Sequence, residues 1–372
     1  MSELYTASRI RAFRACPRAH AYRYALGIRT ASSPAMAFGT AAHEALEAWY
    51  RAWQAAVTGE GDVRLTAALA AVDACGADEI DQIKLRALIV AYHLKWGGED
   101  WEVLAVEQEF SYWLGDVQIG GKIDAIIREA TGRVFVVEHK TSTADTSPGS
   151  PYWHRLAIDT QISIYLDAGA ALDLEFAGCI YDVLKRPMHE IRLATPPDRR
   201  KYTDGKGCKS CGGSAKPGAI EQGRGYTSVV FASEVKRPEC SDCKGTGWKC
   251  DTSGNPQSPR LHANLRATDE THSEYEARLT DEISSRVDDY LSRGAIVRLE
   301  SDLPRMRQEL LDTIESMRRL GDLAPPNHDN CVRGREFCPF FAACSGQADV
   351  NDQHVFPRGE THPELVVINR VA

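Results

Sequence analysis

Two short apolar runs on either side of a turn give the clearest local pattern in the chain. They cover residues 121–128 and 134–140, and both are rich in β-branched side chains. Residues 129–132, which end in Gly132, supply the turn between them. This pattern predicts a β-hairpin. The second run has no polar residue before Glu138, which is typical of a strand buried on both faces.

Elsewhere the spacing of apolar positions alternates between the helical and the strand period. It predicts helices over residues 36–57, 156–172, 268–293 and 303–320, two more within 63–97, and strands over 101–113, 176–184 and 295–299. Because strands and helices are interleaved, we expect an α/β fold in which helices pack around a central sheet. Residues 195–262 lose this periodicity and are rich in Pro, Gly, Lys and Ser, which predicts an insertion.

Composition narrows the class of protein. The chain has 372 residues, of which 43% are apolar, enough for a sizeable core. A net charge of −8 excludes a generally basic nucleic-acid binder, so any such contact needs a local patch or bound metal. No export signal or membrane-length apolar run is visible, so we expect a cytoplasmic prokaryotic protein, with a phage as a suggested source. Residues 115–122 lack phosphate-loop spacing, so no nucleoside triphosphatase is predicted.

Charged residues close the second strand of the predicted hairpin. Glu138, His139 and Lys140 follow an interior strand, where charges are rarely buried unless they are paired or bound to metal. Asp124 lies on the neighbouring strand, so two carboxylates and an amine can meet at one point. This set suits a divalent-metal phosphodiesterase, in which the carboxylates bind Mg²⁺ or Mn²⁺ and the lysine positions the nucleophile or offsets charge. A salt bridge at an exposed strand end is the alternative interpretation.

Two predicted helices carry further polar candidates. His43 lies within the helical pattern of residues 36–57, where it either packs or binds metal. An imidazole nitrogen would suit Mn²⁺ better than Mg²⁺. Gln161 and Tyr165 are four residues apart, so they share one face of the second helix. An ordinary amphipathic helix is the alternative there.

The first thirty residues are notably basic. Arginines occur at positions 9, 11, 14 and 18, with Cys16-Pro17 among them. They form either a solvated helix face or a surface that contacts phosphates.

Eleven cysteines without an export signal favour metal sites over disulfides. Two Cys-x-x-Cys knuckles lie in the insertion, Cys208 with Cys211 and Cys240 with Cys243, and glycine follows each closely. They predict a structural four-cysteine Zn²⁺ site, which a small insert with few apolar residues needs. The second knuckle resembles the repeats of DnaJ-type zinc domains. A loop with reduced thiols is the alternative.

A separate group of cysteines lies near the C-terminus. Cys331, Cys338 and Cys344 are closely spaced and surrounded by phenylalanines. Three cysteines leave a tetrahedral or cubane site one ligand short, and Cys16, which precedes a proline as Cys338 does, is the natural fourth. Aromatic cover suits an iron–sulfur cluster, whose properties depend on solvent exclusion. Zinc is the alternative metal.

Taken in order, these residues resemble the PD-(D/E)XK nuclease superfamily and, within it, the RecB-like nucleases. The match covers roughly residues 8–185 and 325–346. Its elements are Asp124 with Glu138-x-Lys140, the Gly39-x-x-x-His43 segment and Gln161-x-x-x-Tyr165. One cysteine far upstream and three far downstream is similar to AddB-type and CRISPR-associated RecB-like nucleases, which carry a [4Fe–4S] cluster. The late spacing, C-x6-C-x5-C, is looser than that family's C-x2-C-x5-C.

The resemblance implies a restriction-endonuclease-like fold, with a mixed central sheet flanked by helices and helical elaborations. It also implies a Mg²⁺- or Mn²⁺-dependent DNA exonuclease acting on single-stranded or frayed ends. Asp124, Glu138, His43 and the backbone carbonyl of His139 would bind the metal, and Lys140 would orient the attacking water. Gln161 and Tyr165 would shape the site and contact DNA. The cluster held by Cys16, Cys331, Cys338 and Cys344 would tie the chain's ends together. A helicase or annealing protein is a further candidate partner.

We therefore expect a RecB-like core over residues 1–195, a zinc-knuckle insertion over 196–262, and C-terminal helices with the cluster cysteines over 263–372. Two alternatives remain. One is a non-catalytic DNA-binding accessory protein of recombination or repair with structural metal sites. The other is an RNA nuclease, because zinc knuckles bind single-stranded RNA.

Overall fold

A computed structural model describes residues 3–31, 33–55, 63–202, 241–242, 249–253, 260–299, 301–321, 324–333, 336–360, 362 and 365. The chain divides into two compact units, one formed by Met1–Met188 with Leu279–Ala372 and the other by His189–Arg278. The predicted zinc ligands, Cys208, Cys211, Cys240 and Cys243, lie outside the described residues.

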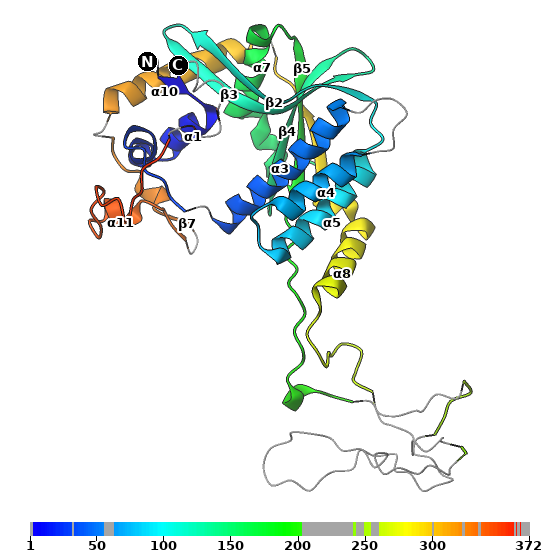
Figure 1. Ribbon diagram of the computed structural model, residues 1–372. Coiled ribbons are helices and arrows are strands. Elements are labelled where there is room, and N and C mark those ends of the chain that lie inside the picture. The colour runs from blue at the N-terminus through cyan, green and yellow to red at the C-terminus, as the bar shows by residue number, and fades with distance from the viewer. Residues whose placement is uncertain are drawn as a thin grey trace. The chain divides into compact units, whose positions relative to one another are not determined.

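The larger unit is built on a six-stranded mixed sheet, visible in Figure 1 behind helices α3 to α5. Its order is β1-β3-β4-β5-β6, and β2 pairs with β3 as well. The pairs β1–β3 and β4–β5 are parallel, whereas β2–β3, β3–β4 and β5–β6 are antiparallel. The strands are β1 (Leu4–Tyr5), β2 (Trp101–Leu114), β3 (Val117–Glu129), β4 (Val134–Ser142), β5 (Phe176–Lys185) and β6 (Leu291–Ile296). The prediction of a mixed central sheet is confirmed.

The predicted hairpin is confirmed as β3 and β4. Antiparallel pairing runs from Arg128↔Val134 to Ala125↔Val137. Gly132 in the turn has φ of 84°, a conformation that glycine adopts without steric cost. Every residue of β4 from Val134 to His139 is buried, as a strand covered on both faces requires.

Helices cover both faces of the sheet (Figure 1). On one face lie α3 (Pro34–Ala55), α4 (Arg64–Ala74) and α5 (Glu79–Trp96). The opposite face is covered by α1 (Ala7–Ala15), α7 (Thr160–Asp167) and α10 (Asp302–Leu320). Apolar side chains of α1, α7 and α10 pack with the sheet in one buried cluster that includes Ile10, Ile162 and Leu310.

The other helices and strands are short apart from α8, which has 14 residues. They are α2 (Pro17–His20), α6 (Pro151–His154), α8 (His272–Ser285), α9 (Val287–Tyr290), β7 (Val332–Arg333), β8 (Glu336–Phe337) and α11 (Phe341–Cys344). None of the helices in the described part of the chain combines the length and apolarity needed to cross a bilayer.

The prediction of one helix over residues 268–293 was wrong at its C-terminal end. Helix α8 ends at Ser285, α9 follows, and strand β6 begins at Leu291. There Arg293 pairs in register with Asp182 of β5, and Leu291 pairs with Leu184. Pairing with a distant strand therefore overrides the local helical period.

The predicted helix over residues 156–172 is interrupted. A 3₁₀ turn covers Arg155–Ile158, and α7 begins only at Thr160. The side chain of Asp159 caps α7 by accepting hydrogen bonds from the backbone N–H groups of Gln161 and Ile162. An aspartate N-cap satisfies donors that have no partner within the helix, which sets the start of α7.

In the smaller unit, two extended segments run side by side. Backbone hydrogen bonds join Thr195 to Arg266 at 2.9 Å and His262 to Lys201 at 3.0 Å. The carboxylate of Glu270 accepts two hydrogen bonds from the guanidinium of Arg278, each of 2.7 Å. This contact with Arg278 lowers the pKa of Glu270 to about 2.

A buried ion pair joins β5 to β6. Asp182 has no exposed surface and accepts hydrogen bonds from Arg293 Nε at 2.5 Å and Nη2 at 2.7 Å. The hydroxyl of Tyr92 on α5 donates to the same carboxylate at 2.7 Å. The Arg293 guanidinium also stacks over the ring of Trp96, 4.1 Å from its centroid. The Asp182 carboxylate thus links α5, β5 and β6.

We expect Arg293→Met to lower the free energy of unfolding by about 3–5 kcal/mol, because it leaves the buried Asp182 charge without its partner. The double variant Arg293→Met/Asp182→Leu should recover much of that loss. Urea denaturation measures both. Arg305→Met is the control, because Arg305 forms an exposed pair with Asp302 and should cost less than about 1 kcal/mol. A cost for Arg293→Met no larger than that of the control would contradict this account.

Candidate active site

The sheet places two carboxylates where β3 and β4 part. The last paired positions are Ala125 and Val137, so Asp124 and Glu138 lie just beyond them on neighbouring strands. Beyond this point β4 continues its parallel pairing with β5 from Glu138 through Lys140. Glu138 and Lys140 are two residues apart, so their side chains lie on the same face of the strand.

Glu138 is 1% exposed, and its two carboxylate oxygens differ in their hydrogen bonding. Oε1 accepts hydrogen bonds from Lys140 Nζ and, at 2.8 Å, from Gln161 Nε2. Oε2 is buried and has no hydrogen-bond partner among the described residues. Burial, followed by the nearby charge of Asp124, raises the pKa of Glu138 in spite of Lys140.

Asp124 is held by nitrogen atoms from two elements. Its Oδ2 accepts a hydrogen bond of 2.8 Å from the backbone N–H of His139. The Nδ1 atoms of His139 and of His43 on α3 lie 3.4 Å and 3.5 Å from the same oxygen. Burial acts to raise the pKa of Asp124, but His43 and His139 outweigh it, so that pKa lies well below its usual range.

Lys140 lies beside the two carboxylates and forms an ion pair with Glu138. Burial acts to lower its pKa, but the charges of Glu138 and Asp124 outweigh this effect and the pKa is raised. The side chain is therefore an ammonium at neutral pH. It can donate hydrogen bonds and offset negative charge, but it holds no free electron pair for proton abstraction.

Gln161 and Tyr165, on one face of α7, form a short chain of hydrogen bonds. The Gln161 amide nitrogen donates to Glu138 Oε1 at 2.8 Å and to the Tyr165 hydroxyl at 2.7 Å. The hydroxyl in turn donates to the backbone carbonyl of Lys122 on β3 at 2.7 Å. The side-chain oxygen of Gln161 accepts from Arg11 Nη2 at 3.2 Å. This chain fixes the orientation of Glu138.

These side chains surround a cavity of about 180 Å³, which we call the carboxylate cavity. It is lined by Asp124, Glu138, Lys140, Gln161 and Tyr165, together with residues of α1 and β3. Beside it, Glu107 of β2 forms an ion pair with Lys122. Glu107 has φ of 54°, a left-handed conformation unusual for this residue type.

The donor set suits a hard divalent cation. Carboxylate oxygens are the ligands that Mg²⁺ prefers, and a buried carboxylate oxygen without a donor is costly unless a cation compensates it. Glu138 Oε2 is such an atom. Within the described ranges, no group of three or more His, Cys, Asp and Glu side chains converges closely enough to form a complete metal site. The fit therefore rests on the carboxylate pair.

The structure places Cys16 beside the C-terminal segment, but among the described residues no three cysteines converge closely enough to form a metal site. The backbone N–H of Asn327 donates to Cys16 Sγ at 3.3 Å, and the N–H of Cys338 donates to the Cys331 carbonyl at 2.8 Å. Burial raises the pKa of Cys344, and the Cys338 and Cys16 thiols add to the effect. A cavity of about 380 Å³ lies here, with Cys16, Cys338, Phe337 and Phe340 in its lining.

The basic N-terminal segment divides into structural and exposed arginines. Arg9 is buried, forms an ion pair with Glu3 and lies over the Tyr5 ring. Arg11 and Arg14 line a cavity next to Lys140.

Residue patterns alone had not singled out Lys122, Asp159 or Asp182. Asp182 carried a usable signal, because an aspartate inside an apolar strand needs a partner.

One comparison, with a family model, agrees with the geometry. The family model described as "PD-(D/E)XK nuclease superfamily" matches residues 5–345. A solved structure titled "Crystal structure of SSO0001" is 22% identical with a TM-score of 0.20, and the match covers 38% of this chain and 61% of that one. No curated protein matches. Because the family model spans most of the sequence, including β3, β4 and α7 with their carboxylate-cavity residues, this chain belongs to the PD-(D/E)XK nuclease superfamily.

Proposed function

We propose that this chain is a Mg²⁺- or Mn²⁺-dependent deoxyribonuclease that works as an exonuclease on single-stranded or frayed DNA ends. Its superfamily consists of nucleases, which supports phosphodiester hydrolysis. The observation that carries the proposal is the unpartnered, buried Oε2 of Glu138 beside a second carboxylate, Asp124. A site built only for stability would not keep a buried carboxylate oxygen without a donor.

In this proposal Asp124 and Glu138 hold the cation, with His43 and the backbone carbonyl of His139 as further ligands. When bound, the divalent ion lowers the pKa of water and stabilises charge on the phosphate. His43, whose Nδ1 lies 3.5 Å from Asp124 Oδ2, is the nitrogen donor that would favour Mn²⁺.

Lys140 orients the attacking water and offsets negative charge on the phosphate. Its amine, which bonds to Glu138 Oε1, is placed to donate hydrogen bonds to the water and the phosphate. Gln161 holds Glu138 Oε1, and Tyr165 holds Gln161, so these two residues position the carboxylate rather than react. Accurate positioning of such groups is a large part of catalysis.

Action on single-stranded or frayed ends is proposed from the resemblance to RecB-like nucleases. DNA is the proposed substrate over RNA because the ordered motif set resembles RecB-like enzymes. A panel of matched DNA and RNA oligonucleotides, single-stranded and duplex, tests this choice directly.

We further propose that Cys16, Cys331, Cys338 and Cys344 hold a [4Fe–4S] cluster that joins the two ends of the chain. The 3.3 Å contact between Cys16 and the Asn327 N–H and the aromatic lining of the nearby cavity support this assignment. Zinc bound by the insertion cysteines, which lie outside the described residues, stays a prediction from their spacing.

We expect Lys140→Ala to lower the rate of Mn²⁺-dependent DNA cleavage by about 10²–10³-fold, the range typical of removing one positioned hydrogen-bond donor that stabilises developing charge. Single-turnover cleavage of an end-labelled oligonucleotide measures it. Lys95→Ala is the matched control, because Lys95 pairs with Asp288 away from the carboxylate cavity. Undiminished cleavage by Lys140→Ala would refute the mechanism.

We expect Tyr165→Phe to cost about 1–3 kcal/mol of unfolding free energy, because it leaves the Lys122 carbonyl and one Gln161 N–H unpaired. The cleavage rate should fall with it. Tyr290→Phe is the control, because the Tyr290 hydroxyl on α9 has no hydrogen-bond partner among the described residues and lies outside the carboxylate cavity. Urea denaturation should show little loss for Tyr290→Phe. Equal losses for both variants would show that Tyr165 has no special role.

Anaerobic purification with metal analysis tests the cluster. We expect a brown protein with about four irons per chain, and Cys16→Ser should lose that iron. Cys75→Ser is the control, because Cys75 lies at the end of α4 and bonds to the Val72 carbonyl. A colourless wild-type protein that holds zinc at the end cysteines would overturn the iron–sulfur assignment and leave the nuclease proposal intact.

A further inference from the structure

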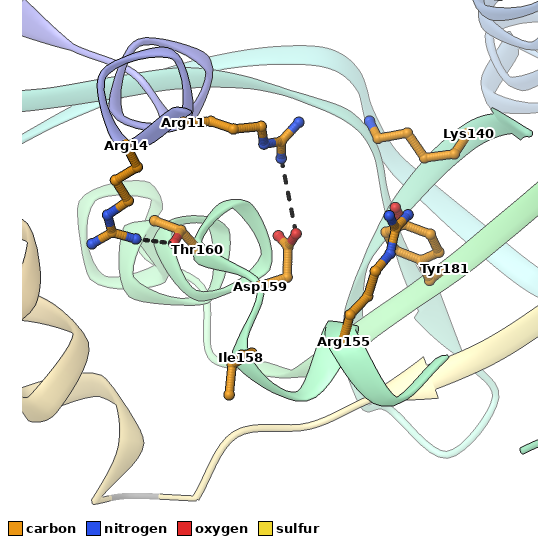
Figure 2. A pocket seen from close by; sticks show the side chains of 8 residues that line it. All are labelled: Arg11, Arg14, Lys140, Arg155, Ile158, Asp159, Thr160 and Tyr181. Carbon is orange, nitrogen blue, oxygen red and sulfur yellow. Dashed lines mark hydrogen bonds and ion pairs between the residues drawn. The ribbon is translucent and has the colours of Figure 1, made fainter. Parts of the chain in front are cut away.

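A second cavity, of about 360 Å³, lies beside the carboxylate cavity. Arginines from two elements reach into it, Arg11 and Arg14 from α1 and Arg155 from the turn before α7 (Figure 2). Lys140 enters from the other side, and Asp159 lies between the cations in this view. We call this cavity the arginine pocket.

The positive charge of the arginine pocket is largely uncompensated. Arg14 donates to two hydroxyls, Thr160 Oγ1 at 2.8 Å and Thr313 Oγ1 at 3.2 Å, and no carboxylate pairs with it in the described ranges. Arg155 stacks over the Tyr152 ring at 4.2 Å and likewise has no acidic partner among the residues described. Neutral partners orient these guanidinium groups without cancelling their charge.

Among the described residues that line the arginine pocket, Asp159 is the one carboxylate, and it already accepts other hydrogen bonds. Asp159 Oδ1 accepts the backbone N–H groups of Gln161 and Ile162 at the start of α7. Its Oδ2 lies 3.9 Å from Arg11 Nη2, at the outer limit for an ion pair. An anion with several oxygens would compensate these arginines better than Asp159 does, because guanidinium groups match phosphate geometry.

Lys140 lines both the carboxylate cavity and the arginine pocket. Arg11 also bonds to Gln161, which holds Glu138, so the two cavities share a wall of hydrogen-bonded side chains. An anion in the arginine pocket would therefore lie within one side-chain length of a phosphate at the carboxylates. Successive phosphates along one nucleic acid strand are separated by a comparable distance.

We propose that the arginine pocket binds the backbone phosphate next to the one that is cut, which makes Arg14 and Arg155 substrate-positioning residues. The proposal rests on the nuclease function and adds a subsite to it. Ile158, 80% exposed at the edge of the pocket, offers an apolar surface for the sugar or base of the same nucleotide. The recognised chemistry is a phosphodiester in a flexible single strand.

The test is the double variant Arg14→Gln/Arg155→Gln, assayed on single-stranded oligonucleotides that carry one neutral methylphosphonate at successive positions. In the wild type, one position next to the cut should raise KM about tenfold, because a charged hydrogen-bonding contact is lost there. In the double variant KM should already be raised about tenfold, and that position should add no further penalty. The slope of log affinity against log salt should become shallower by about 0.7, the value for one phosphate on a single strand.

Two further variants separate charge from fold. Arg14→Lys/Arg155→Lys keeps both charges and should restore most of the salt slope. Arg128→Gln is the matched control, because Arg128 pairs with Glu102 and lines neither cavity, so its salt slope and methylphosphonate profile should equal those of the wild type.

The outcomes distinguish this subsite from the function on which it rests. If the wild type cleaves and the double variant keeps both the wild-type salt slope and the same methylphosphonate penalty, the arginine pocket is not a phosphate site and the nuclease proposal stands. If the wild type neither binds nor cleaves any oligonucleotide with Mg²⁺ or Mn²⁺, both proposals are overturned.

Discussion

The compensation of buried charge in the middle of β4 is the constraint on which the rest of this structure depends. The part of β4 that is buried on both faces ends in Glu138 and His139, and its neighbour β5 carries Asp182. Arg293 pairs with Asp182, and the His139 ring lies between Asp182 and Asp124, 3.9 Å and 3.4 Å from their oxygens. Buried charges are tolerated only with such partners, so the surrounding elements are fixed by the need to supply them.

The negative charge of Asp124 is fully compensated by its neighbours, whereas that of Glu138 is not. Asp124 Oδ2 faces three nitrogen atoms, and its pKa is well below the usual range after burial is outweighed. Glu138 keeps one buried oxygen without a donor, and its pKa is raised. Natural sites often give up stability in this way where function needs an unsatisfied group. The asymmetry is the reason to regard Glu138 as the point where a cation completes the site.

The N-terminal helix connects three features that are far apart in the sequence. Arg11 and Arg14 of α1 line the arginine pocket, and Cys16 follows the same helix. The backbone around Cys16 is held by the C-terminal segment, because Asn327 and Asn330 bond to the Ala15 carbonyl at 3.1 Å and 2.7 Å. The contacts that fix Cys16 against the C-terminal segment therefore also fix α1, which places Arg11 and Arg14 beside the carboxylates.

The sequence by itself determined the hairpin and the ordered polar residues of the site, because strand period, turn chemistry and charge after an apolar run are local properties. The mixed sheet was expected only from the family resemblance, because strand direction depends on pairing between distant segments. The sequence did not determine where α7 begins or that Leu291 starts a strand, because the Asp159 cap and the pairing of Arg293 with Asp182 compete with helical periodicity. Only the tertiary structure decided the opposite pKa shifts of Glu138 and Asp124. It also decided that Arg11, Arg14 and Arg155 line one cavity. Burial and charge proximity depend on residues brought together from α1, β3, β4 and α7, and no single stretch of sequence contains that information.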